Sequence, residues 1–134
     1  KVLRIKVDEN DSKEEIYQKW MKAFPNLKKI VSTRRIKANA SSNGLSAVFW
    51  DGEKIYKSQK YYVSHIIDRI GAGDAFMAGI IYGLISWPDD SQMALEFAVA
   101  ATCLKHSISG DVNLSSVNEI KSLMSGFGGG RVSR

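Results

Sequence analysis

A glycine-rich turn between two acids holds the residues of this chain that are best suited to chemistry. Residues 68–76 read Asp-Arg-Ile-Gly-Ala-Gly-Asp-Ala-Phe, and the apolar run at 75–87 that follows predicts a mostly buried helix. Glycines let the backbone approach a ligand closely, and the free N–H groups that open a helix form an anion site. An anion site beside a carboxylate such as Asp74 is what phosphoryl transfer to a hydroxyl requires.

The spacing alone leaves a plainer alternative, in which Asp74 is only a first-turn acid at the start of a helix. The whole segment, however, resembles the C-terminal signature of the ribokinase-like (PfkB) carbohydrate kinases, which usually reads Asp-Thr-x-Gly-Ala-Gly-Asp-x-Phe. It departs from that signature at Arg69, where the family usually has threonine. The resemblance implies that Gly71, Ala72 and Gly73 form the anion hole for the transferred phosphate, and that Asp74 is the catalytic base.

The same resemblance implies an α/β fold, the ribokinase-like three-layer sandwich with helices on both faces of a sheet. It covers only the C-terminal portion of that fold. We therefore expect residues 1–134 to be the C-terminal part of a single kinase domain, without the N-terminal sugar-binding half and its lid, and inactive as an isolated fragment. The glycine-rich end, residues 126–134, predicts a flexible tail.

The composition is that of one globular domain. Hydrophobic residues make up 44% of the 134 residues and charged residues 25%, and no apolar run approaches the ~20 residues of a membrane span. We therefore expect no membrane partner and, since the first residues carry no signal-peptide core, a cytoplasmic protein. The single cysteine, Cys103, cannot form an internal disulfide and is expected to be a small core residue.

The net charge of +5 is spread along the chain rather than gathered on one helix face. The only basic cluster, at residues 28–29 and 34–37, has no nucleic-acid-binding motif beside it, so we expect no nucleic-acid partner. This basic cluster is then either a solvent-exposed face or a patch that attracts phosphate. His65, His106 and Cys103 lack the spacing of metal ligands, so we predict no metal site.

The remaining elements follow from caps, breakers and hydrophobic spacing. In chain order we predict a helix between the Ser12–Glu15 capping box and Pro25, a short buried strand at 27–33, a hairpin of strands at 45–50 and 54–58 around Asp51-Gly52, a buried helix at 92–104, and a last helix after the Ser116–Glu119 capping box.

A polar loop is predicted from Thr33 to Gly44, after a strand at 27–33 that we expect to be parallel. Folds of the α/β class place ligands outside the carboxyl ends of such strands. In ribokinase-like kinases the equivalent strand end contacts the nucleotide, which makes Thr33 and Arg34 candidates for the ATP side. The alternative is an exposed flexible loop without a ligand.

Three further residues receive roles through the resemblance. Asp111 follows Gly110 in a polar turn that approaches the sugar acid in 2-keto-3-deoxygluconate kinases, so it is a candidate substrate contact. A Gly-Asp turn without a ligand is the alternative. Arg69 would add positive charge near the phosphates, or else pair with Asp68 or another acid and hold the loop.

The function implied is ATP-dependent phosphorylation of a primary hydroxyl of a sugar acid. Asp-Arg at 68–69, the turn at 105–114 and the Gly-Arg-Val ending look most like 2-keto-3-deoxygluconate kinases, which make the 6-phosphate of that sugar acid. ATP is implied, with Mg²⁺ held upstream of this segment, and the family adds a monovalent cation and homo-oligomers as further candidates. The rivals are another sugar or nucleoside kinase, acting on fructose or ribose, and a non-catalytic ligand-binding relative.

Overall fold

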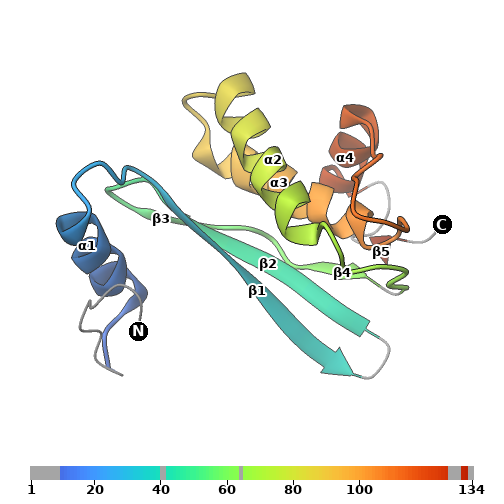
Figure 1. Ribbon diagram of the computed structural model, residues 1–134, viewed down its shortest axis with the longest axis horizontal. Helices are drawn as coiled ribbons and strands as arrows, with labels where there is room; N and C mark the ends of the chain where they lie inside the picture. The colour runs from blue at the N-terminus through green and yellow to red at the C-terminus, as the bar shows by residue number, and fades with distance from the viewer. Residues whose placement is uncertain (1–9, 40–41, 64, 127–130, 133–134) are drawn as a thin grey trace.

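The chain forms a sheet with one helix on one face and three helices on the other (Figure 1). The computed structural model describes residues 10–39, 42–63, 65–126 and 131–132. The elements in chain order are α1 (Lys13–Ala23), β1 (Ile30–Asn39), β2 (Ser42–Trp50), β3 (Ile55–Lys57), β4 (Tyr61–Val63), α2 (Ala72–Ser86), α3 (Ser91–Lys105), α4 (Val117–Met124) and β5 (Arg131–Val132). This layered arrangement of helices on both faces of a sheet confirms the predicted α/β class.

β2 is the central strand of the described sheet. It pairs antiparallel with β1 along one edge and with β3 and β4 along the other, and β4 pairs parallel with β5. The predicted Asp51-Gly52 hairpin joins β2 to β3. The Asp51 N–H donates to the Lys54 carbonyl at 3.3 Å, and Gly52 adopts a φ of 108° that favours glycine.

The polar loop predicted at residues 33–44 is instead a pair of strands. Only residues 40–41, which lie outside the described residues, separate β1 from β2. The two strands run antiparallel, with Arg34 opposite Ser46, whereas a parallel strand was predicted. β1 begins at Ile30, which is half-buried rather than buried. Antiparallel pairing satisfies the backbone of a strand whose side chains stay exposed, so a polar strand resembles a loop in sequence.

α1 packs on the face of the sheet that carries Ser32 and Trp50. Ser12 and Glu15 form the predicted capping box at its start, because each side chain accepts the backbone N–H of the other residue. The Tyr17 and Ser32 hydroxyls lie 3.2 Å apart, and the rings of Tyr17 and Trp50 have centroids 6.4 Å apart. These contacts attach α1 to both β1 and the end of β2.

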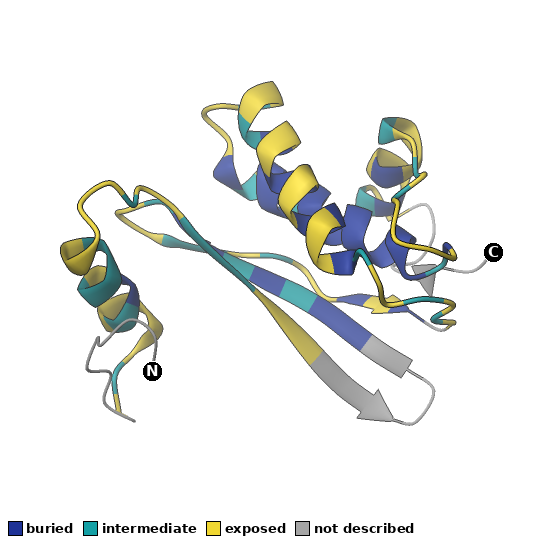
Figure 2. Cartoon of the chain, viewed as in Figure 1, coloured by how far each residue is buried: buried dark blue, intermediate teal, exposed yellow. Residues whose placement is uncertain are grey.

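α3 is buried, as its sequence predicts, and packs beside α2 on the same face of the sheet (Figure 2). Gly79 and Gly83 of α2 face Ala98 and Ala94 of α3, and a Cβ on either glycine would come within 2.7 or 2.6 Å of the facing Cα. The two helices therefore pack with their backbones unusually close. Cys103 is fully buried, which raises the pKa of its thiol and confirms its prediction as a core residue.

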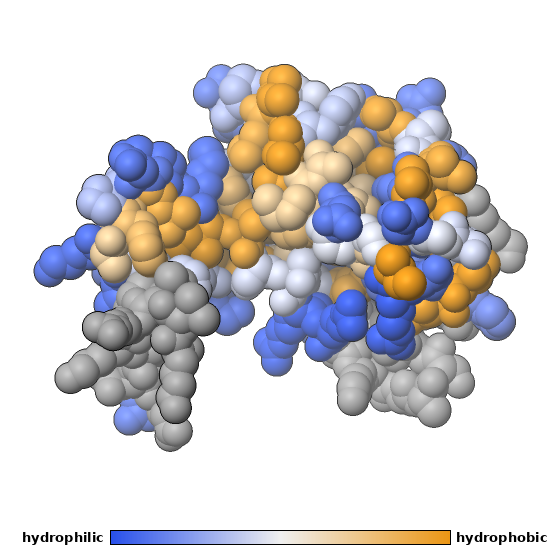
Figure 3. Space-filling model, in the orientation of Figure 1, coloured by the Kyte–Doolittle hydropathy of each residue, from blue (hydrophilic) through white to orange (hydrophobic). Residues whose placement is uncertain are grey.

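α2 is buried on one face only, which corrects the prediction of a mostly buried helix. Phe76 and Ile80 are 4% exposed and belong to the core, whereas Met77, Ile81 and Ile85 are 46%, 55% and 76% exposed. Apolar side chains therefore cover the outer surface of α2 (Figure 3). The residues are apolar all round the helix, so their pattern does not indicate which face has neighbours. No helix within the described ranges is long and apolar enough to cross a membrane.

The last described elements are α4 and β5. The predicted capping box of Ser116 and Glu119 starts α4, and Gly126, with a φ of 77°, follows its end. The tail predicted at 126–134 contains β5, which pairs with β4. Residues 127–130 and 133–134 of that tail lie outside the described residues.

Candidate active site

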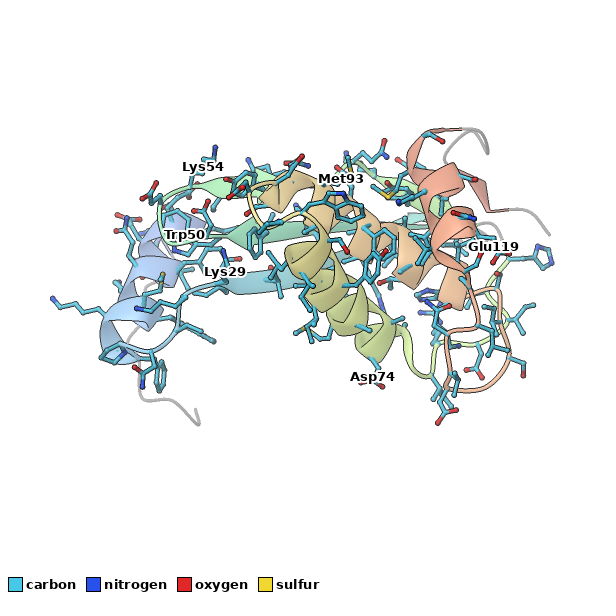
Figure 4. All side chains as sticks on the ribbon, turned by 90° about the horizontal axis from the view of Figure 1, so that it is seen from above. Lys29, Trp50, Lys54, Asp74, Met93 and Glu119 are labelled. Carbon is cyan, nitrogen blue, oxygen red and sulfur yellow. The ribbon has the colours of Figure 1, made fainter. Side chains whose placement is uncertain are left out.

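The chain enters α2 through a tight turn at Gly71, and this turn is the centre of the candidate site. Gly71 caps the helix with a φ of 74°, a left-handed conformation that favours glycine. The helix begins at Ala72, so Gly73 and Asp74 lie in its first turn rather than in a loop before it. Asp74 is exposed, and its carboxylate points outward from the N-terminal end of α2 (Figure 4).

The first turn of α2 leaves backbone donors free. The Ala75 N–H donates to the Gly71 carbonyl at 2.9 Å, and the Ala72 N–H reaches the Arg69 carbonyl at 3.4 Å. The N–H groups of Gly73 and Asp74 have no hydrogen-bond partner within the described residues. Two free donors at the positive end of the helix dipole are suited to hold an anion.

Nothing among the described residues requires a glycine at position 73. The φ of Gly73 lies outside the left-handed region, and a Cβ placed on it would meet no described atom within 4 Å. The absent side chain therefore leaves open space directly beside the free N–H groups and the Asp74 carboxylate. Glycine allows a ligand to approach the backbone closely at such a position.

The turn after α3 lies directly against the glycine turn. A Cβ on Gly71 would come within 1.8 Å of the carbonyl oxygen of Asp111. This contact brings Asp111, the predicted substrate residue, next to the start of α2, and its side chain is exposed there. Two segments far apart in the sequence thus form one site.

Asp68 links the same two segments through its carboxylate. One oxygen accepts the Ile70 N–H at 3.0 Å, and the other accepts the Gly110 N–H at 3.0 Å. These two hydrogen bonds hold the pKa of Asp68 below its usual value. The Ile67 N–H also donates to the His106 carbonyl at 2.8 Å. Asp68 is therefore engaged with the backbone and forms no ion pair with Arg69 among the described contacts.

A small pocket of about 70 Å³ opens beside the glycine turn. Its lining residues are Thr33, Arg35, Leu45, Ala72, Gly73, Thr102 and His106. Thr33, one of the two residues predicted for the ATP side, therefore lies next to Gly73. Arg34 does not, because side chains alternate along β1 and Arg34 lines a different pocket on the other face of the sheet.

Arg35 and His106 are pocket residues that the sequence analysis missed. Arg35 is two residues after Thr33 and shares its face of β1, so recognition of the segment as a strand would have identified it. His106 gave no comparable signal. It lies in a segment predicted to be a polar turn, yet packing at the end of α3 leaves it only 2% exposed.

Positive charge gathers around His106. Its Nδ1–H donates to the Thr102 carbonyl at 2.7 Å, since that oxygen can only accept. Burial lowers the pKa of His106, and the positive charges of Arg35, Arg69 and Lys105 lower it further. The neutral imidazole is therefore favoured, and three permanent or strongly basic cations act on the pocket beside the glycine turn.

Lys105 is fully buried, although it was predicted to begin a polar turn. Its Nζ donates to the Ile108 carbonyl at 3.0 Å. Its charge also contributes to the lowered pKa of Asp68, after the two backbone hydrogen bonds. A buried ammonium group thus stabilises the turn after α3 and adds to the positive potential of the site.

The described residues do not fit a metal-ligand set. Among them, no group of three or more His, Cys, Asp or Glu side chains is placed to hold a metal ion. Asp68, Asp74 and Asp111 lie near the glycine turn without forming such a group. The site therefore consists of backbone donors, basic side chains and separate carboxylates.

Comparison with known families identifies this arrangement. Residues 41–116, which include the glycine turn, α2 and α3, match the pfkB family of carbohydrate kinases. The match extends over more than half of the chain, and the chain belongs to this family. Comparison with curated proteins gives no match.

Solved structures of the same family resemble this chain. A PfkB family carbohydrate kinase from Listeria grayi is 30% identical, with a TM-score of 0.76 over 89% of this chain and 36% of its own. The 2-dehydro-3-deoxygluconokinase of Thermotoga maritima is 35% identical, with a TM-score of 0.74 over 90% of this chain and 37% of its own. A candidate 2-keto-3-deoxygluconate kinase from Enterococcus faecalis is 29% identical, with a TM-score of 0.76. The chain thus spans little more than a third of the length of these kinases.

Proposed function

We propose that the protein containing this chain transfers the γ-phosphate of ATP to a primary hydroxyl of a sugar acid. The observation that carries this proposal is the open space in front of Gly73, bordered by two free N–H groups and by Asp74. A purely structural helix start has no need of a glycine there. A site that receives a phosphate needs both the space and the donors.

In the proposed mechanism Asp74 accepts the proton of the attacking hydroxyl. It is exposed at the end of α2, so a substrate can reach it without rearrangement of the core. A positioned general base contributes about 10²–10⁴-fold to such a reaction. The oxygen atom that loses its proton then forms the new bond to phosphorus, while the bond from phosphorus to ADP breaks.

The free N–H groups of Gly73 and Asp74 hold the phosphate oxygens during transfer. They are fixed at the start of a helix, so they need no reorganisation as negative charge spreads over the phosphoryl group. Arg35, which lines the adjoining pocket with Thr33, is suited to the ATP phosphates. This proposal replaces Arg34 with Arg35 on the nucleotide side.

Asp111 and Arg69 have supporting roles in the proposal. Asp111 is placed beside Gly71, where its exposed carboxylate would accept hydrogen bonds from substrate hydroxyls. Arg69 adds positive charge to the pocket, as its effect on the pKa of His106 indicates. The guanidinium of Arg69, where the family usually has threonine, also repels any monovalent metal cation that would bind beside it.

Mg²⁺ accompanies ATP in phosphoryl transfer and neutralises phosphate charge when bound. The described residues offer no ligand set for it, so we assign it no ligand in this chain. The steps above depend on backbone N–H groups, basic side chains and Asp74 alone.

The sugar acid that we propose is 2-keto-3-deoxygluconate, also called 2-dehydro-3-deoxygluconate. The support is the 35% identity to the 2-dehydro-3-deoxygluconokinase of Thermotoga maritima, together with the Asp68-Arg69 departure from the family signature. Fructose, ribose and nucleoside substrates are the alternatives within the fold. A relative that binds its ligand without turnover is the alternative outside catalysis.

The test is a kinase assay on the complete protein that contains this chain. ADP release is measured with ATP and 2-keto-3-deoxygluconate, fructose or ribose, and the Asp74→Asn variant is compared with the unmodified protein. We expect phosphorylation of the sugar acid, and a loss of about 10²–10⁴-fold in kcat for Asp74→Asn with ATP affinity retained. We also expect no turnover by the 134-residue chain alone.

The control is Asp89→Asn, an exposed carboxylate in the turn between α2 and α3 that lies outside the site. It should leave kcat unchanged. Phosphorylation of a different sugar would retain the mechanism and change the substrate. ATP binding without phosphorylation of any sugar tested would favour the non-catalytic relative.

A further inference from the structure

A second pocket, of about 310 Å³, lies on the opposite face of the sheet from the glycine turn. It is lined by Lys13, Ser32, Arg34, Ser46, Ala47, Val48, Lys57, Ser58 and Lys60. Four of these residues are cationic and none is acidic. We refer to this hollow as the basic pocket.

Strand register explains why these side chains meet. Arg34 of β1 is paired with Ser46 of β2, and Lys57 of β3 is paired with Val48, two residues further along β2. All four therefore share one face of the sheet. Neighbouring strands lie about 4.8 Å apart, so β1 and β3 are separated by about 10 Å across β2. The long side chains of arginine and lysine can reach a common ligand over that distance.

The other two cations come from outside these three strands. Lys13 is the first residue of α1, and the contact between Tyr17 and Ser32 holds that helix on the same face. Lys60 lies in the connection between β3 and β4. The hydrogen bond from the Ala47 N–H to the Ser58 hydroxyl, 2.9 Å long, ties that connection to β2. The pocket is therefore formed by elements with fixed relative positions.

Within the described residues, the charged groups of the basic pocket have no partner. None of the four cationic side chains forms an ion pair, a hydrogen bond or a contact with an aromatic ring. Other lysines do have such partners: Lys29 lies 5.4 Å from the centre of the Phe49 ring, and Lys54 lies 4.8 Å from that of Tyr56. Four unpartnered cations around one hollow repel each other, and an anion relieves that repulsion.

We propose that the basic pocket binds the phosphate group of a small phosphorylated molecule. A phosphate offers several oxygens to converging cations and to the Ser46 hydroxyl, which has no other partner within the described residues. The sheet separates this site from the glycine turn, so the two can be occupied independently. This inference does not depend on the proposed kinase activity.

The test is a titration of the ¹⁵N-labelled complete protein that contains this chain with inorganic pyrophosphate, followed by amide chemical shifts at constant ionic strength. We expect saturable shifts at Ser46, Val48, Lys57 and Lys60. The double variant Lys57→Glu/Lys60→Glu should weaken binding by about tenfold or more, because it reverses two of the four charges. All of these side chains are exposed or half-buried, so the fold should be retained.

The matched control is Lys22→Glu/Lys28→Glu, which changes the net charge equally at exposed residues outside the pocket. It should weaken binding by less than about twofold, because screening limits the effect of distant charges. Equal weakening by both variants, shifts without saturation, or shifts confined to the glycine turn would each overturn the proposal.

Titration with glucose 6-phosphate and with orthophosphate shows whether the pocket also recognises the organic part of a phosphate ester. Tighter binding of the ester supports a metabolite, and equal binding supports recognition of the phosphate group alone.

Discussion

The carbonyl oxygen of Asp111 lies only 1.8 Å from the position that a Cβ on Gly71 would take, so the two atoms would overlap. The turn after α3 and the start of α2 are therefore in direct backbone contact. Asp68 strengthens the contact with its hydrogen bonds to Ile70 and Gly110, one on each segment. The candidate site is thus assembled by backbone atoms before any catalytic side chain is considered.

Substitution of Gly71 by alanine should destabilise the protein strongly. Alanine adopts a φ of 74° only at a cost of about 1–2 kcal/mol, and its methyl group would also displace the Asp111 carbonyl. The matched control is Gly126→Ala, which has a similar φ of 77° with no atom within 4 Å of the added Cβ. Urea denaturation should show a loss for Gly71→Ala that exceeds the control by about 1 kcal/mol or more. Equal losses would mean that the contact with Asp111 contributes nothing.

Substitution of Gly73 by alanine should have the opposite pattern. The added methyl group meets no protein atom, so the free energy of unfolding should stay the same or rise by up to about 1 kcal/mol. The same methyl group would enter the space proposed for the phosphate. Calorimetric titration of the complete protein with ATP should therefore show binding weakened by about tenfold or more. Unchanged ATP affinity would remove the main support for the anion site.

Asp68→Asn should loosen the link between the two segments of the site. The two N–H groups bind different carboxylate oxygens, and asparagine replaces one of these oxygens with an NH₂ donor, so either the Ile70 or the Gly110 N–H loses its acceptor. Hydrogen exchange should become faster at one or both of these amides, while core amides such as that of Leu95 keep their protection. The control is Asp89→Asn, which should leave exchange at Ile70 and Gly110 unchanged.

The burial of His106 should make stability fall in mildly acidic solution. Its pKa is lowered from 6.5 in the folded protein, so below pH 6.5 the unfolded chain binds a proton that the folded chain excludes. The free energy of unfolding should therefore decrease from pH 7.5 to 5, by at most about 1.4 kcal/mol per pH unit for one proton. The carboxyl groups with lowered pKa values, Asp68 among them, act below this window, since their usual values are 4.5 or less.

The variant His106→Gln separates this effect from general acid sensitivity. Glutamine does not titrate, so the variant should show a flatter dependence of stability on pH between 7.5 and 5, even if it is less stable throughout. Denaturant titrations at several pH values provide the measurement. A dependence as steep as in the unmodified protein would assign the acid sensitivity to another group.

The elements with local chemical signals were predictable from the sequence. The capping boxes at Ser12 and Ser116, the hairpin at Asp51 and the glycine turn at Gly71 each depend on a few consecutive residues. Such signals are read from neighbours in the chain, so no knowledge of the tertiary structure is needed. The fold class followed from the same turn through its resemblance to a known family.

The features that depend on long-range packing were not predictable. The part of β1 after Thr33 was predicted to be a loop because its charged side chains, Arg34 and Arg35 among them, conceal the alternation of a strand. That error also grouped Thr33 with Arg34, whereas the alternation of β1 places Arg35 beside Thr33 in the pocket next to Gly73. The exposed face of α2 and the burial of His106 depend on which segments pack against them, and the local sequence holds no information about that.

The close packing of α2 on α3 couples the far part of α2 to the position of Asp74 at its start. Gly83 lies nine residues from Asp74 along α2, which corresponds to about 14 Å of helix. A methyl group on Gly83 would come within 2.6 Å of the Ala94 Cα, and the helix could relieve that overlap by tilting. A tilt of about 5° would move Asp74 by about 1 Å, which in the proposed mechanism is large enough to reduce the rate by about 100-fold. The position of Asp74 is therefore set in part by the missing side chain of Gly83, near the other end of the same helix.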